Sequence, residues 1–155
     1  MNNRGIIVLD PGHGQFGNKH TTRDGFYEGT QNFILASFLK AELEALGFEI
    51  KMTRNAVEED MGLVERGSMS GNLGAVMFLS IHSNAPGGNP ADERYPRVRG
   101  AETFYSVSDV EGNAPIARAL NKAVVRTMQT EDRGIKTRRY PDNESVDYYG
   151  VLRSA

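Results

Sequence analysis

The stretch Ile6-Ile7-Val8-Leu9, followed by Asp10-Pro11-Gly12-His13-Gly14, decides the fold. Four consecutive apolar residues indicate a strand that is covered on both faces, which is the pattern of a parallel sheet. The proline and glycines behind it predict a turn. The glycines beside His13 let the backbone and a ligand come close, and they permit positive φ angles. We therefore expect a buried first strand that carries a histidine at its carboxyl end.

Helical and extended patterns alternate along the rest of the chain. Ala36, Leu39, Leu43 and Leu46 recur at helical spacing, and Gly47 stands where a helix should end. Residues 48–52 alternate between apolar and polar, as a strand does, whereas residues 61–73 predict a weaker helix that glycines interrupt. Residues 76–81 predict the strongest buried strand of the chain.

The second half of the chain is more polar. Residues 86–99 predict an exposed loop, and residues 102–107 predict a strand. Asn113 as a cap and Pro115 in the first turn predict a helix whose apolar face holds Ile116, Leu120, Val124 and Met128. Residues 130–147 have an irregular pattern, and residues 148–152 favour one more strand. Together these elements predict a single α/β domain, with a mostly parallel twisted sheet flanked by helices.

Composition excludes several classes of function. The chain has 155 residues, a hydrophobic fraction of 39% and a net charge of -2, which gives no electrostatic reason to bind nucleic acid or an anionic membrane. No stretch reaches the roughly 20 apolar residues of a membrane span, and the N-terminal apolar run is too short for a signal peptide. Because cysteine is absent, any metal must be held by His, Asp or Glu. We expect a monomer.

Two of the three histidines follow the two most apolar strands directly. His13 comes after residues 6–9 and His82 after residues 76–81, while His20 lies in the loop between. Ligands of parallel α/β sheets bind at the carboxyl ends of the strands, so this placement favours a metal or catalytic site. The alternative is that each histidine only caps or satisfies its own loop.

A catalytic zinc ion usually takes three protein ligands and leaves a fourth position for water. The third ligand would be His20 or a carboxylate. Glu28 stands at the expected start of the first helix, where an acid also suits the helix dipole, and Asn32 would share its helix face. The residues alone leave Glu28, Asp24 and Glu102 as alternatives.

The chain carries an ordered set of motifs at 10–14, Glu28-Gly29, Thr53-Arg54, Leu63 with Arg66, 80–85, 100–105, 132–136 and 151–153. This ordered set resembles the zinc-dependent N-acetylmuramoyl-L-alanine amidases. In that family the histidine of the first of these motifs, the glutamate of the second and the histidine of the motif at 80–85 bind one zinc ion. The resemblance therefore implies His13, Glu28 and His82 as ligands, and it leaves His20 without a role.

The resemblance also implies a fold, a substrate and a reaction. The fold would be the phosphorylase/hydrolase-like amidase fold, and the partner would be peptidoglycan, outside the cytoplasm at the cell wall or in the periplasm. The reaction would hydrolyse the amide bond between N-acetylmuramic acid and L-alanine. Zinc suits this chemistry because it lowers the pKa of bound water and polarises the scissile carbonyl.

The resemblance further implies a general-base glutamate on a strand beyond residues 151–153, followed by a closing helix. The chain ends at Ala155 with no acid after Asp147, so we expect residues 1–155 to be a C-terminally truncated catalytic domain, the alternative being a degenerate form. Glu102 is the candidate catalytic carboxylate within the chain, against the alternative of an exposed strand residue. Arg66 and Asn84 are predicted to support the site loops, and Asn84 also to touch substrate.

Two groups of basic side chains are candidates for binding an acidic stem peptide, although such groups are also typical of solvated loops. They are Arg94, Arg97 and Arg99, and Arg133, Lys136, Arg138 and Arg139. Two other functions stay open from the sequence: a zinc-retaining wall-binding domain without turnover, and a zinc peptidase of the carboxypeptidase kind. The peptidase would need arginines arranged around a terminal carboxylate, and no such group is recognisable.

Overall fold

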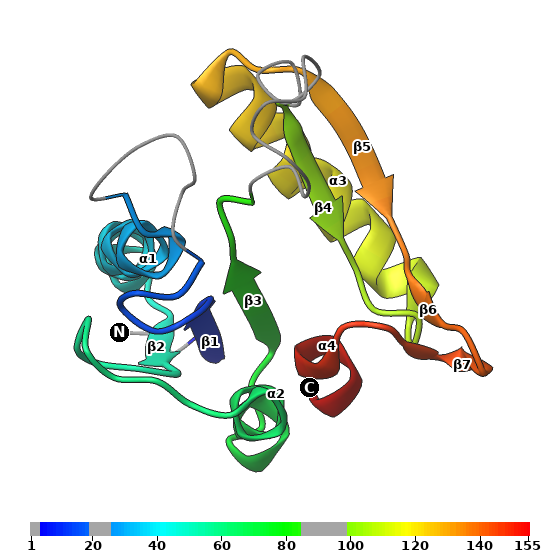
Figure 1. Ribbon diagram of the computed structural model, residues 1–155, viewed down its shortest axis with the longest axis horizontal. Coiled ribbons are helices and arrows are strands. Elements are labelled where there is room, and N and C mark those ends of the chain that lie inside the picture. Colours follow the sequence, from blue (N-terminus) through cyan, green and yellow to red (C-terminus); the bar gives the residue numbers. More distant parts are fainter. Residues whose placement is uncertain (1–3, 19–25, 85–98) are drawn as a thin grey trace. The chain divides into compact units, whose positions relative to one another are not determined.

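A computed structural model describes residues 4–18, 26–84 and 99–155 (Figure 1). It divides into two compact units, residues 1–87 with 154–155, and residues 88–153. Each unit is described by itself. Both contain parallel strands and helices, and the second adds a short antiparallel hairpin, which confirms the predicted α/β fold class. No helix among the described residues is long and apolar enough to cross a membrane.

The first unit is built on a three-stranded parallel sheet. Strand β1 (Ile6–Pro11) lies between β2 (Glu49–Met52) and β3 (Met77–Ile81), so that Val8 is opposite both Lys51 and Phe78. The predicted strands are confirmed, with β1 the most buried of them. Strand β3 is only half-buried along its length, which differs from the expectation, because in this sheet it is an edge strand with β1 as its partner.

Helices α1 (Glu28–Ala45) and α2 (Leu63–Asn72) pack against this sheet. Ala36 is fully buried and Leu39 and Leu43 pack on the core, as their spacing predicted, but Leu46 is exposed. The expected helix end is confirmed, since Gly47 has a φ of 91° and donates its N–H to the Glu44 carbonyl at 3.0 Å. Apolar residues from β1, β2 and α1 make the core of the unit.

The second unit contains β4 (Ala101–Phe104), α3 (Val110–Met128), β5 (Asp132–Lys136), the short hairpin β6 (Arg139–Tyr140) and β7 (Asn143–Asp147), and α4 (Gly150–Ser154). Strands β4 and β5 pair in parallel, and α3 packs against both. The expectation of an irregular segment over 130–147 is therefore wrong, and so is the expectation of a strand over 148–152, where the chain forms α4.

Helix α3 begins earlier than its sequence predicted. Asp109, and not Asn113, is the cap: its carboxylate accepts the N–H of Gly112 at 3.0 Å. Pro115 consequently lies inside the helix. The four apolar residues predicted to share a face do lie in this helix, but Ile116, Val124 and Met128 are exposed and Leu120 is half-buried, while the buried positions of the helix are Ala117 and Asn121.

Candidate metal centre

The carboxyl ends of β1 and β3 meet at one edge of the sheet of the first unit. The N–H of Gly12 donates to the Ile81 carbonyl at 3.0 Å, which continues the pairing of the strands into the turn that carries His13. His82 follows β3 directly. The strand-end argument thus placed the two histidines correctly, and their ring centroids lie 4.9 Å apart.

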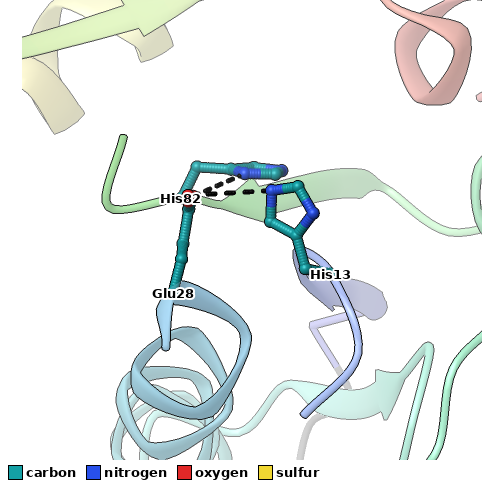
Figure 2. Close-up of side chains that lie close together, drawn as sticks. All are labelled: His13, Glu28 and His82. Carbon is teal, nitrogen blue, oxygen red and sulfur yellow. Dashed lines mark hydrogen bonds and ion pairs between the residues drawn. The ribbon is translucent and has the colours of Figure 1, made fainter. Parts of the chain in front are cut away.

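Glu28 reaches the same point from the first turn of α1 (Figure 2). Its Oε1 lies 2.9 Å from Nδ1 of His82, and its Oε2 lies 3.7 Å from Nε2 of His13. One ligand atom from each of the three residues falls within 4.8 Å of the others. The structure therefore brings together the three side chains that the sequence singled out.

Two glycines make this approach possible. A Cβ atom at position 12 would lie 2.2 Å from Nε2 of His82, so only glycine leaves room for that ring. A Cβ atom at position 29 would lie 1.7 Å from the carbonyl oxygen of Gly14. Gly29 thus lets the loop after β1 rest on the first turn of α1. The positive φ of this turn belongs to His13 itself, at 63°, and not to the glycines beside it.

Hydrogen bonds fix the carboxylate of Glu28. Its Oε1 accepts the backbone N–H of Ser83 at 3.0 Å, and Asn18 donates to Oε2. Asn32, one turn further along α1, donates to Oε1 at 3.5 Å and to the carbonyl of Gly12 at 3.1 Å. This confirms that Asn32 shares the helix face of Glu28. The carboxylate is 3% exposed, whereas both imidazoles are more than a third exposed and open to a ligand.

The electrostatics favour the metal-binding protonation states of Glu28 and His13. Burial alone would raise the pKa of Glu28, but hydrogen bonds from His82 and Asn18 lower it to about 2, so the carboxylate is ionised at neutral pH. Burial lowers the pKa of His13, and the charges of His82 and Arg66 lower it further, against the opposing effect of Glu28. A neutral imidazole is the form that binds metal.

The donor set fits a zinc ion. Two imidazole nitrogens and one carboxylate are a ligand set that catalytic zinc uses, and bond lengths of about 2.0–2.1 Å place tetrahedral ligand atoms about 3.4 Å apart. The separation of 2.9 Å between Oε1 of Glu28 and His82, and that of 3.7 Å between its Oε2 and His13, lie on either side of that value. His20 and Asp24, the other ligand candidates from the sequence, lie outside the described residues.

A buried polar network supports the edge of the sheet beneath these residues. Asp10 is fully buried and accepts from Thr53 at 2.7 Å, from Ser80 at 2.6 Å and from Arg66 at 3.0 Å. Arg66 also donates to the carbonyls of Met61 and Pro11 and pairs with Asp60. Its guanidinium is thus occupied in holding the turn before His13. Asn84 is exposed two residues beyond His82, and its contact with substrate stays a prediction.

Glu102 belongs to the second unit and is not part of the cluster. Its carboxylate lies against Lys136 and 3.1 Å from Arg133, and it is 15% exposed. These contacts join β4 to β5, and a catalytic role for Glu102 stays a prediction. Of the other cations, Arg99 pairs with Glu131 and Arg138 lies over the ring of Tyr148 at 3.6 Å, whereas Arg94 and Arg97 lie outside the described residues.

Comparison with known proteins identifies the family. The Amidase_3 family model, described as N-acetylmuramoyl-L-alanine amidase, matches residues 7–155. The chain belongs to this family. It is 30% identical over 132 residues to the N-acetylmuramoyl-L-alanine amidase LytC of Bacillus subtilis, covering 84% of this chain and 25% of LytC. It is 29% identical over 137 residues to the sporulation-specific N-acetylmuramoyl-L-alanine amidase of the same organism, covering 86% and 49%.

Solved amidase structures have the same fold. The N-acetylmuramoyl-L-alanine amidase from Clostridium difficile 630 superposes with a TM-score of 0.76 at 25% identity, over 99% of this chain and 75% of that one. The catalytic domain of CwlV from Bacillus (Paenibacillus) polymyxa gives 0.70 at 28% identity, over 92% and 73%. The chain spans between a quarter and a half of the two Bacillus subtilis relatives.

Sequence reasoning gave no role to Arg54, which is buried beneath the site and donates to the carbonyls of Pro11 and Gly29. A signal was present, because Thr53-Arg54 directly follows β2 at the same sheet edge as the histidines. The strand-end rule that nominated His13 and His82 applies equally to that pair.

Proposed function

We propose that this chain is the zinc-binding part of a peptidoglycan amidase that hydrolyses the bond between N-acetylmuramic acid and L-alanine. The observation that carries the proposal is the convergence of His13, Glu28 and His82 in a chain of the amidase family. The relatives named as N-acetylmuramoyl-L-alanine amidases support the substrate. Action on peptidoglycan implies a location outside the cytoplasm.

The residues at this site have different roles. His13, Glu28 and His82 would hold zinc, which when bound supplies an acidified water and a polarised scissile carbonyl. Among the ligands only Glu28 would carry a negative charge, since neutral imidazoles carry none. The divalent ion and its ligands would therefore keep a net positive charge, which stabilises the developing oxyanion. The backbone N–H of Ser83 and the amide of Asn32 hold the carboxylate of Glu28 in place.

Metal binding is the first test. The purified protein should bind one zinc ion, and His82→Ala should lose tight binding because two ligands rarely hold the ion well. Leu63→Ala is a suitable control, since Leu63 is an exposed residue at the start of α2 that makes no contact with the cluster. Tight zinc binding by His82→Ala would refute the ligand assignment.

Turnover is the second test. Purified cell walls should lose turbidity with the zinc-loaded protein, and a chelator should stop the loss. The products should carry new amino termini on L-alanine, with the glycan strands intact. Walls that stay turbid while zinc remains bound stoichiometrically would instead support a binding domain without turnover. Cleavage inside the stem peptide would support the zinc peptidase.

A further inference from the structure

Arg54 is almost completely buried, at 1% exposed, and it contacts the segments that carry His13 and Glu28. Each of its three guanidinium nitrogens donates a hydrogen bond. Nε donates to the carbonyl of Pro11 at 3.1 Å, Nη1 donates to the carbonyl of Val57 at 2.9 Å, and Nη2 donates to the carbonyl of Gly29. The ring of Phe33 covers the group, with its centroid 5.0 Å from Cζ.

Two of these acceptors belong to segments that carry metal ligands. Pro11 lies two residues before His13, and Gly29 directly follows Glu28. One planar group therefore ties the end of β1 to the first turn of α1, although residues 14–27 separate these segments in the sequence. The third ligand is connected through the same turn, because the N–H of Gly12 donates to the carbonyl that precedes His82.

The burial of the Arg54 guanidinium lowers the stability of the fold. In the described part of the chain, all the hydrogen-bond acceptors of Arg54 are backbone carbonyls, so the buried cation has no directly bonded carboxylate. Burying a charge without such a partner costs free energy. Burial lowers the pKa of Arg54 and the nearby charge of Arg66 lowers it further, while Asp60 and Asp10 act in the opposite direction.

Geometry explains why an arginine is used here. The guanidinium presents its donors in a rigid planar fork, whereas a lysine ammonium is a single point on a flexible stem. A lysine could reach one of the three carbonyls but could not fix the distance between two of them. The fork thus sets the separation of the His13 and Glu28 segments, which is the quantity that a metal site depends on.

We propose that Arg54 is a positioning residue of the metal centre, which fixes the turn before His13 against the first turn of α1 and thereby sets the spacing of the ligand atoms. This inference rests on the proposed function, because it requires that His13, Glu28 and His82 bind a metal ion. It adds a residue that contacts neither the metal nor the substrate. Supporting residues of this kind typically change metal affinity about 10–100-fold when they are replaced.

The test compares Arg54→Lys and Arg54→Met with the unaltered protein and with Ile50→Ala. Ile50 is a buried residue of β2, and its truncation destabilises the same sheet without touching the site. Zinc dissociation constants are measured by chelator competition, and the visible absorption of the Co²⁺-loaded proteins reports the geometry of the ligands. Urea denaturation of the metal-free proteins gives the loss of stability in each variant.

Both Arg54 variants should bind zinc about 10–100-fold more weakly and should have altered cobalt spectra. Ile50→Ala should keep the affinity within about threefold and keep the spectrum, although its stability falls. Equal affinities and spectra for Arg54→Lys and the unaltered protein would overturn the inference. The inference would also be overturned if Ile50→Ala weakened zinc binding as much as the Arg54 variants do at a comparable loss of stability. Failure of both Arg54 variants to fold at 10 °C would overturn it too, since the role of Arg54 would then be in folding.

The controls separate this inference from the proposed function. If the unaltered protein binds neither zinc nor cobalt, the metal centre itself is refuted and the positioning role falls with it. If the unaltered protein binds both metals and Arg54→Lys is unchanged, only the positioning role is refuted.

Discussion

Replacing Gly12 by alanine should damage the metal centre while leaving the fold almost unchanged. The new Cβ would lie 2.2 Å from both Cε1 and Nε2 of His82, and ordinary contact begins at 3.4 Å. The imidazole must therefore retreat by about 1.2 Å. It can do so, because more than a third of the His82 side chain is exposed and can swing towards solvent.

The size of the effect follows from that displacement. Zinc–nitrogen bonds are about 2.0–2.1 Å long, so a ring that has moved by more than half a bond length no longer binds. Changes in supporting residues alone cost about 10–100-fold in affinity, and loss of a ligand should cost at least the upper end of that range. The free energy of unfolding of the metal-free protein should change by less than about 1 kcal/mol, because the φ of Gly12 is not positive and alanine loses less chain entropy on folding.

Chelator competition measures the affinity, and urea denaturation measures the stability. Gly71→Ala is the matched control, because a Cβ at this position in α2 would meet no atom within 4 Å. It should leave zinc affinity unchanged and stabilise α2 by up to about 1 kcal/mol. Zinc affinity of Gly12→Ala within about threefold of the unaltered protein would refute the argument, since His82 would then bind from a position that the alanine does not restrict.

Three further predictions concern stability. Asp10→Ala removes the only fully buried carboxylate that pairs with Arg66 among the described residues and leaves it the largely exposed carboxylate of Asp60. The change should cost about 3 kcal/mol in urea denaturation, and a loss below about 1 kcal/mol would contradict the network. Asp109→Ala removes the cap of α3 and should cost about 1 kcal/mol, visible as a lower Tm, whereas an unchanged Tm would show that the cap contributes nothing. Burial would raise the pKa of Glu28, but hydrogen bonds outweigh it and lower this pKa from 4.5 to about 2, so the metal-free protein should lose stability as the pH falls through that interval. Glu28→Gln should remove this pH dependence of the free energy of unfolding. The same pH dependence in the variant would assign it to another group.

The sequence predicted the first unit well because its signals are local. Residues 6–9 are uniformly apolar and β1 is buried on both faces, so pattern and environment agree. The positions of His13 and His82 followed from one topological rule about the ends of parallel strands. Glu28 needed the family resemblance, because a first-turn acid is equally explained by the helix dipole.

The second unit was predicted less well because its structure depends on contacts between distant segments. Strand β5 is polar and pairs with β4, about 30 residues earlier, so its own residues carry little strand pattern. Residues 148–152 have strand-like composition, but α4 begins at Gly150. Just before it Tyr149 packs on Phe104, and within it Arg153 donates to the carbonyls of Asp147 and Tyr148. Such contacts outweigh a propensity worth about 1 kcal/mol or less.

The polar side chains that support the metal centre hold the sheet edge through bonds of their own. Asp10, Thr53, Ser80 and Arg66 satisfy one another inside the sheet edge, and these bonds do not involve the ligand atoms. Glu28 is already ionised and held by backbone and amide donors at neutral pH. Because little then remains to be ordered, metal binding should involve little refolding. Variants in this network should therefore change both the stability of the metal-free protein and its metal affinity.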